Sequence, residues 1–229
     1  GCSKGRGGSM HLIDRKVNFM GSTSILGNNL PVGVGLALSA KLKKEKNITY
    51  IFLGDAAVEQ GSFYESLNFA AVNSLNVIFI CENNEFSVYS NLKSRQPKNR
   101  KIHALVKKIG IKSFFSNGQK IDDIEKKMRL SVSYVKKNKK PSFVEIKTTR
   151  WLEHCGPNDD SNLGYRSISK LKKWKKNDFL TNLEKKINKK LYLDKIKKDI
   201  NRKILNAFNI ADNSKFPEFK DLKNGIYEK

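Results

Sequence analysis

Two short polar segments of this sequence carry the side chains best suited to chemistry. The first is Gly-Asp-Ala-Ala at 54–57, and the second is Glu-Asn-Asn at 82–84. A carboxylate and an amide oxygen are hard ligands of the kind that Mg²⁺ and Ca²⁺ prefer. The sequence therefore predicts a divalent cation held by Asp55 and Asn84, with coordination positions left for phosphate oxygens. The alternative is that Asp55 only caps a helix.

The small residues after Asp55 favour an anion next to this cation. Ala56 and Ala57 are predicted to begin a helix that runs to about residue 73. Side chains of that size let a ligand approach the unpaired backbone N–H groups, and the helix dipole favours negative charge there. This pattern is typical of a site for a metal-bridged diphosphate.

The elements around these segments alternate between strands and helices. Short runs rich in β-branched and aromatic residues predict buried strands at 48–53, 77–81 and 143–146. Helices are expected at 30–44, 56–73, 101–109 and 122–137. This order predicts an α/β fold with a mostly parallel sheet flanked by helices. The two polar segments follow neighbouring strands, so they should meet at the carboxyl edge of that sheet.

The net charge is strongly positive. The chain of 229 residues holds 45 Lys and Arg against 22 Asp and Glu, which gives +23. Such a balance is found in proteins that bind nucleic acids or membrane surfaces. Here the lysines lie mostly beside helix positions or in loops, with few aromatic residues between them. We therefore interpret them as solvated helix faces rather than as a nucleic-acid site.

The domain prediction divides the chain after residue 165. Residues 1–165 form the α/β domain, and residues 166–229 form a lysine-rich helical C-terminal extension of it, with Ile196, Ile200, Ile204 and Phe208 in one stripe. The chain begins with Gly1, and we expect it to be truncated at its N-terminus. No apolar run approaches the ~18 residues of a membrane span. Three cysteines without a C-x-x-C pair favour a reducing cytoplasm.

Four motifs together resemble one enzyme family. They are Gly-Gly-Ser-Met-His at 7–11, Leu-Gly-Asn-Asn-Leu-Pro-Val-Gly-Val-Gly at 26–35, Gly-Asp-Ala-Ala-Val-Glu-Gln-Gly from 54, and Ile-Cys-Glu-Asn-Asn at 80–84. The chain from Gly1 to about residue 220 resembles the α subunit of the thiamine-diphosphate-dependent 2-oxo acid dehydrogenases, the pyruvate, branched-chain and acetoin group. In that family roughly a hundred residues precede the position of Gly1, among them Tyr and Arg contacts to the diphosphate.

The resemblance implies a role for each matching residue. Asp55 and Asn84 bind Mg²⁺ through side-chain oxygens, and Phe86 binds it through its backbone carbonyl. The positions that line the cofactor's diphosphate are Gly54, Ala56 and Ala57. Ser24 and Leu26 match the segment that contacts the middle of the cofactor. His154 matches the active-site histidine, which contacts the cofactor near its diphosphate and the reacting centre and assists proton handling or acyl transfer.

The resemblance also implies a partner and a reaction. A β subunit supplies the pyrimidine-binding half of the site, including the glutamate that activates the cofactor, in an α₂β₂ assembly. The expected reaction is decarboxylation of a 2-oxo acid, with transfer of the acyl group to a lipoyl-bearing acyltransferase or to another acceptor. The alternatives are a non-oxidative thiamine-dependent acyl or ketol transferase, a non-catalytic α-like subunit, and a basic nucleic-acid-binding or scaffold protein.

The active-site loop differs from that of the pyruvate group. It keeps one histidine where two are usual, with Leu152 at the other position, so the substrate is left open. Cys155 stands beside His154, and a Cys-His dyad is a minor alternative. We expect His103 to be exposed on its lysine-rich helix and Cys81 to serve packing. His11 either lines the substrate entrance or has a structural role.

Overall fold

The computed structural model describes residues 2, 5, 7–187 and 189–224. The chain forms two compact units, one of residues 25–182 and one of residues 1–24 together with 183–229. The larger unit holds the sheet. The division that the sequence suggests after residue 165 stays a prediction.

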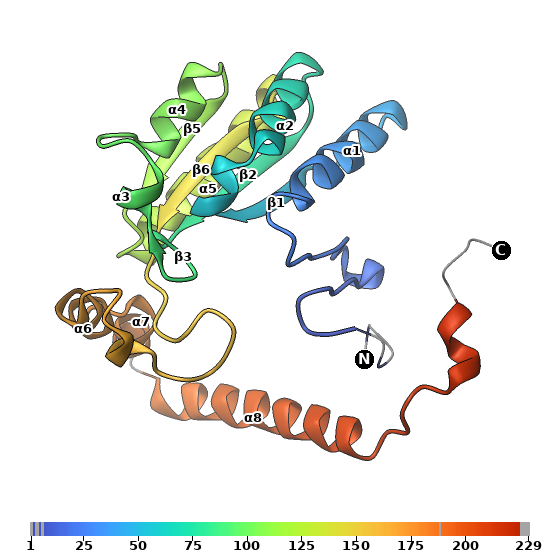
Figure 1. Ribbon diagram of the computed structural model, residues 1–229, viewed down its shortest axis with the longest axis vertical. Coiled ribbons are helices and arrows are strands. Elements are labelled where there is room, and N and C mark those ends of the chain that lie inside the picture. Colours follow the sequence, from blue (N-terminus) through green and yellow to red (C-terminus); the bar gives the residue numbers. More distant parts are fainter. Residues whose placement is uncertain (1, 3–4, 6, 188, 225–229) are drawn as a thin grey trace. The chain divides into compact units, whose positions relative to one another are not determined.

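The larger unit is built on a four-stranded parallel sheet, which confirms the predicted α/β class (Figure 1). Its order is β1-β2-β6-β5, and a separate two-stranded antiparallel ribbon pairs β3 with β4. The strands are β1 (Thr49–Gly54), β2 (Val77–Asn83), β3 (Phe86–Ser87), β4 (Ser90–Asn91), β5 (Lys112–Ser116) and β6 (Ser142–Lys147). The three predicted strands are present, whereas β5 was not predicted.

The helices of this unit are α1 (Asn29–Leu42), α2 (Gly61–Val72), α3 (Leu92–Arg95), α4 (Ile102–Lys108), α5 (Ile121–Asn138), α6 (Ile168–Lys176) and α7 (Phe179–Ile187), the last continuing into the second unit. Helices α1, α2 and α4 cover one face of the sheet, and α5 covers the other. The larger core lies between the sheet and helices α1, α2 and α4, and Phe63, Phe79 and Phe143 are fully buried in it. A smaller core lies under α5, around Ile78, Val135 and Val144.

The helix predicted over 56–73 is wrong at its start. A 3-10 turn, η2, spans Asp55–Glu59, and Gln60 is extended before α2 begins at Gly61. Helix α2 packs one apolar face into the larger core, where Phe63, Leu67 and Ala70 are fully buried. The extended residue Gln60 separates η2 from α2, so Asp55 lies in η2 and not in the helix that packs on the sheet.

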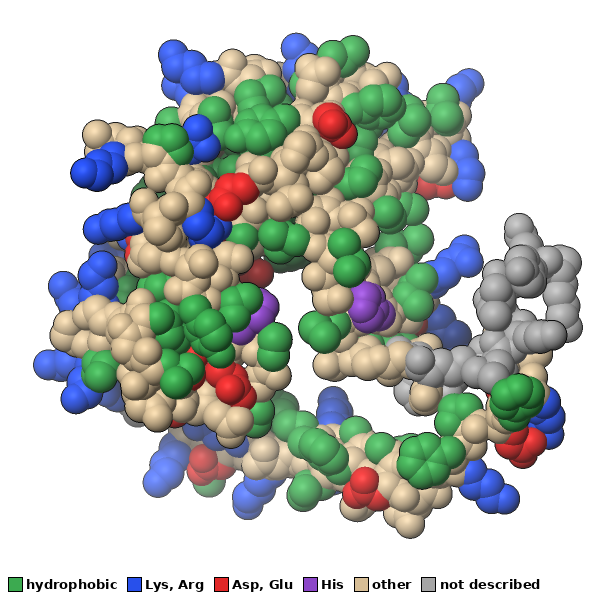
Figure 2. Space-filling view, in the orientation of Figure 1, with side chains coloured by type: hydrophobic (Ala, Val, Ile, Leu, Met, Phe, Trp, Pro, Cys, Tyr) green, Lys and Arg blue, Asp and Glu red, His purple; other side chains and the backbone are tan. Residues whose placement is uncertain are grey.

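The second unit contains helix α8 (Lys190–Asp212) and the N-terminal segment. The predicted stripe of Ile196, Ile200, Ile204 and Phe208 lies on α8, and all four side chains are exposed. Most lysines of α8 are also exposed. Figure 2 shows Lys and Arg side chains scattered over the visible face, with apolar and acidic groups between them. This distribution favours solvated helix faces. Among the described residues, no helix is both long and apolar enough to span a membrane.

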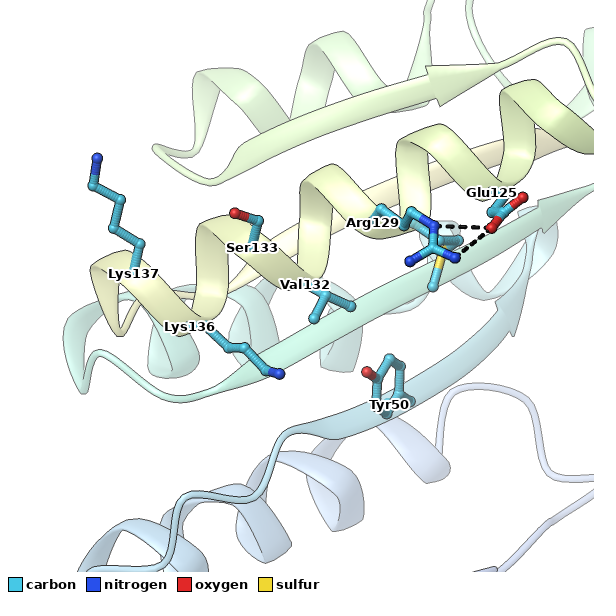
Figure 3. A pocket seen from close by; sticks show the side chains of 8 residues that line it. Tyr50, Glu125, Arg129, Val132, Ser133, Lys136 and Lys137 are labelled. Atoms are coloured by element: carbon cyan, nitrogen blue, oxygen red, sulfur yellow. Dashed lines mark hydrogen bonds and ion pairs between the residues drawn. The ribbon is translucent and has the colours of Figure 1, made fainter.

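Strand β1 is an edge of the sheet, and one of its faces is open. Ile51 and Leu53 point into the larger core, while Tyr50 and Phe52 on the opposite face are 45% and 56% exposed. Tyr50 lines a hollow with residues of α5, where Arg129 is hydrogen-bonded to Glu125 (Figure 3). Helix α5 therefore covers the inner strands and leaves β1 uncovered on this face.

Gly118 fixes the loop after β5 against the end of β6. Its φ of +72° lies in the left-handed region, and a Cβ there would come within 1.6 Å of the carbonyl oxygen of Lys147. Because the obstacle is backbone, relief requires the loop to move. We expect Gly118→Ala to lower the free energy of unfolding by about 3 kcal/mol.

Urea denaturation of the full chain checks this expectation. Gly35→Ala is a suitable control, because Gly35 lies in α1 and an added Cβ meets no atom within 4 Å. Equal stability of the two variants would contradict the close approach of Gly118 to Lys147.

Candidate active site

The two polar segments lie side by side at the carboxyl edge of the sheet, as predicted. Strands β1 and β2 are parallel neighbours, and Gly54 pairs with Glu82 in their register. Asp55 follows Gly54 directly, and Asn84 comes two residues after Glu82. The two residues lie close together, because the backbone N–H of Asn84 is near enough to the Asp55 carboxyl to lower its pKa.

Asp55 is a buried carboxylate with only 1% of its surface exposed. The pKa of the Asp55 carboxyl lies above its usual value, because burial raises it. The interaction with Arg95 and the backbone N–H groups of Asp55 and Asn84 oppose this shift in part. Arg95 Nη2 lies 2.6 Å from Asp55 Oδ2. The surroundings of this carboxylate thus supply positive charge and N–H donors, which a buried anion requires.

A tight turn after β2 positions Asn84 and Phe86. Asn84 Oδ1 accepts a hydrogen bond from the backbone N–H of Phe86 at 2.8 Å, and Asn83 Oδ1 accepts one from that of Glu85 at 3.0 Å. Glu85 has a φ of +68°, and Phe86 then pairs with Asn91 in the small ribbon. The two successive Asn side chains therefore shape the turn that carries two predicted metal ligands.

A buried hydrogen-bond network, which the sequence analysis missed, holds this turn from behind. Glu145 of β6 is 4% exposed, and its Oε1 accepts from Asn83 Nδ2 at 2.8 Å. Its Oε2 accepts from the backbone N–H of His103 at 2.9 Å and lies 2.6 Å from His103 Nδ1. The prediction that His103 is merely exposed is wrong. It lies at the start of α4, where the ring stacks near Phe115 and pairs with the buried carboxylate.

The predicted Cys81 role is confirmed as packing. Cys81 lies in the middle of β2, has no exposed surface and belongs to the larger core. Burial, with the nearby charge of Glu145, raises the pKa of the Cys81 thiol well above its usual value. A thiol in that state is a poor nucleophile. Cys155, in contrast, is exposed on its loop.

The donor set at the strand ends fits a hard divalent cation. Among the described residues no group of three His, Cys, Asp or Glu side chains can hold a metal ion. A metal at this edge would therefore use one carboxylate, one amide oxygen and backbone carbonyls, which are acceptable ligands for Mg²⁺ when phosphate oxygens complete the shell. A buried carboxylate at Asp55 gives such an ion its charge partner. The assignment of Asp55, Asn84 and Phe86 as metal ligands stays a prediction.

The predicted diphosphate positions lie directly beside Asp55. Gly54 is exposed, and a Cβ added to it would meet no atom within 4 Å, so open space lies next to its backbone. Ala56 and Ala57 are buried in the 3-10 turn η2. A ligand can therefore approach the backbone closely at Gly54, whereas the roles of Ala56 and Ala57 stay predictions.

Ser24 and Leu26 lie on either side of the boundary between the two compact units. Ser24 belongs to the smaller unit, where its hydroxyl is 3.2 Å from His11 Nε2. Leu26 belongs to the larger unit and is 48% exposed. His11 thus has a polar partner within its own segment. The predicted cofactor contacts of Ser24 and Leu26 stay predictions.

The loop that carries His154 is joined to the turn after β2 by a chain of contacts. The Phe86 ring meets the Tyr165 ring edge-on at 5.5 Å, and the Tyr165 hydroxyl accepts from Arg150 Nη2 at 2.6 Å. Arg150 Nη2 also donates to the Val88 carbonyl, and its Nη1 is 3.4 Å from His154 Nδ1. The structure thus joins the predicted catalytic histidine to the turn after β2.

Asp160 organises this loop from inside. It is buried, forms an ion pair with Arg166, and accepts from the Tyr165 hydroxyl at 2.5 Å. Burial raises the pKa of Asp160, but Tyr165 and Arg166 outweigh it, so the pKa lies below the usual value. The carboxylate is therefore charged at neutral pH. Its stabilisation is present above the unfolded-state pKa and is lost only as the pH falls through the lower folded-state pKa.

We expect Asp160→Asn to loosen residues 150–166 at neutral pH, because the ion pair with Arg166 loses its negative partner. Limited trypsin digestion should cleave the variant after Arg150 or Arg166 about tenfold faster, as expected for a loop whose local opening becomes easier. Asp159→Asn is the matched control, since Asp159 is the exposed neighbour. Equal digestion of the two variants would show that Asp160 does not hold the loop.

Comparisons with known proteins give the family of this chain. The family described as dehydrogenase E1 component matches residues 1–220. The pyruvate dehydrogenase E1 component subunit alpha of Rickettsia bellii is 35% identical over 232 residues, covering 99% of this chain and 70% of the relative. The subunit of the same name from Zymomonas mobilis is 29% identical over 231 residues, covering 99% of this chain and 64% of the relative.

A solved transketolase structure from Pichia stipitis superposes on 56% of this chain and 20% of its own, with 24% identity and a TM-score of 0.48. Membership rests instead on the family match, which spans nearly the whole chain, and on the Rickettsia relative. This chain belongs to the dehydrogenase E1 component family, the thiamine-diphosphate-dependent 2-oxo acid dehydrogenases, as an E1 α subunit.

Proposed function

We propose that this chain binds thiamine diphosphate through Mg²⁺ and, with a β subunit, decarboxylates pyruvate or a closely related 2-oxo acid. The observation that carries the proposal is the buried Asp55 carboxylate at the end of β1, close to Asn84, which follows the neighbouring strand β2. Pyruvate is the first candidate substrate, because the relatives from Rickettsia bellii and Zymomonas mobilis are pyruvate dehydrogenase E1 component α subunits.

The residues of this chain have separate tasks in the proposal. Asp55, Asn84 and the Phe86 carbonyl would hold Mg²⁺, and the open backbone at Gly54 would admit the diphosphate. The bound cofactor supplies the electron sink that loss of CO₂ requires. His154, with Arg150 against its Nδ1, would hold or move a proton near the reacting centre.

The remaining parts of the proposal concern partners. A β subunit would complete the site in an α₂β₂ assembly, and the acyl group would pass to a lipoyl-bearing acyltransferase or another acceptor. The single histidine in 151–155 sets this loop apart from the two-histidine pattern, so the 2-oxo acid has to be identified by assay.

The testing experiment is a calorimetric titration of thiamine diphosphate into the full chain co-expressed with its β subunit. We expect binding in the presence of Mg²⁺ and its loss when EDTA removes the metal. A screen of 2-oxo acids for CO₂ release, starting with pyruvate, then identifies the substrate. Absence of Mg²⁺-dependent binding by a folded αβ complex would refute the proposal.

A further inference from the structure

Arg95 occupies a position that the proposed function does not explain. It ends the short helix α3, and its guanidinium bridges two acidic side chains. Nη2 lies 2.6 Å from Asp55 Oδ2, and Nη1 lies 2.5 Å from Glu59 Oε1. Its Nε also donates to the Ser90 carbonyl at 3.3 Å. An arginine therefore lies directly against the carboxylate assigned to the metal.

The burial of Asp55 explains why a cation is needed at this point. Leaving a buried carboxylate without a charge partner is strongly unfavourable. In the chain without metal, Arg95 is the cation that meets this need, and its planar fork of N–H groups suits carboxylate geometry. A divalent ion on Asp55 would meet the same need. The metal and the guanidinium would then be two positive charges on one carboxylate, and they would repel each other.

The surroundings of Arg95 allow it to give up Asp55 and remain paired. Glu59, the second partner, has a side chain 27% exposed against 1% for Asp55, and it is also hydrogen-bonded to Gln96 Nε2 at 3.0 Å. Arg95 itself is 13% exposed. The guanidinium can therefore turn towards Glu59 and solvent, whereas Asp55 has no comparable freedom.

We propose that Arg95 is the resident counter-cation of the metal position, and that metal binding displaces it from Asp55 while it stays paired with Glu59. This inference rests on the proposed function, since it requires a metal at Asp55. It gives the chain a charge-balanced state without cofactor. It also makes metal affinity lower than the ligand set alone would give, because each binding event must break the Arg95–Asp55 pair.

Two other roles for Arg95 give different outcomes. A fixed structural pair would keep Asp55 oriented, so its loss would weaken metal binding and lower stability together. A direct contact to the diphosphate would make its loss weaken binding of thiamine diphosphate. The counter-cation role alone predicts effects of opposite sign: lower stability without metal and tighter metal binding.

The experiment measures Mg²⁺ affinity by calorimetry on the full chain with its β subunit, at saturating thiamine diphosphate. Thermal unfolding without Mg²⁺ or cofactor is recorded on the same samples. We expect Arg95→Met to bind Mg²⁺ about tenfold more tightly, because a competing charge beside the ion is gone. The same variant should unfold at a lower temperature without metal. Lys93→Met, an exposed charge change on the same helix, is the matched control.

Arg95→Gln is the second variant, because Gln can donate to Asp55 without carrying charge and keeps the fold if Met does not. It should also bind Mg²⁺ more tightly. Unchanged or weaker Mg²⁺ binding by both variants would overturn the inference. A wild-type complex that shows no Mg²⁺-dependent binding would instead refute the proposed function.

Discussion

We expect Asp55→Ala to weaken Mg²⁺-dependent binding of thiamine diphosphate at least 100-fold in the αβ complex. The variant removes the single charged ligand of the assigned set, and the remaining amide and carbonyl oxygens offer a divalent ion no charge compensation. It also leaves Arg95 beside the metal position without the carboxylate that it now pairs with, which adds repulsion. Calorimetric titration at fixed Mg²⁺ concentration measures the loss.

A matched variant separates this effect from a general change of charge. Asp122→Ala removes a carboxylate from the exposed first turn of α5 and should leave cofactor affinity within about twofold of wild type. Asp55→Asn keeps the shape of the side chain, so it should retain the fold while losing most of the affinity. Cofactor binding at wild-type strength by either Asp55 variant would refute the metal assignment.

The second large effect is expected for His154→Ala. Turnover of the 2-oxo acid should fall about 100-fold, the lower range for loss of a general acid or base. The affinity for thiamine diphosphate should stay within about threefold, because the metal ligands proposed to anchor the diphosphate are unchanged in this variant. Steady-state kinetics of CO₂ release and calorimetry on the same sample give the two numbers.

Cys155→Ala is the control for this prediction. Cys155 is the adjacent exposed residue of the same loop, so its loss tests disturbance of the loop and the Cys-His dyad together. We expect turnover close to wild type. Unchanged turnover in His154→Ala would show that this histidine has only a structural role. A large loss of turnover in Cys155→Ala would instead support the Cys155–His154 dyad.

The sequence predicted the parts of the fold that depend on local pattern. Buried parallel strands have continuous apolar runs, and these runs predicted β1, β2 and β6. The polar segments that follow β1 and β2 were predicted with them. Adjacency of those ends followed from the topology of one strand-helix-strand unit, and the register of Gly54 with Glu82 confirms it. The motifs around Asp55 and Asn84 indicated the enzyme family and the candidate site residues.

The missed features depend on contacts between distant segments. Strand β5 reads Lys-Ser-Phe-Phe-Ser, which is too short and too mixed to give a periodic signal. The Glu145 network joins residues 62 and 42 positions apart, and its only signal was a charged residue inside an apolar strand. The Arg95–Asp55 pair spans 40 positions, and no local pattern indicates it.

The open face of β1 has a consequence for the behaviour of the chain in isolation. The free side of an edge strand has no neighbouring strand to pair with, although here the Phe52 carbonyl accepts a hydrogen bond from Asn29 Nδ2. The exposed side chains of Tyr50 and Phe52 add apolar surface to this edge. Such edges promote self-association through strand addition. The high positive charge works against it by mutual repulsion. Colloidal stability should therefore depend on ionic strength. Added salt screens the repulsion between chains, so association through the β1 edge should increase and the turbidity of the solution should rise.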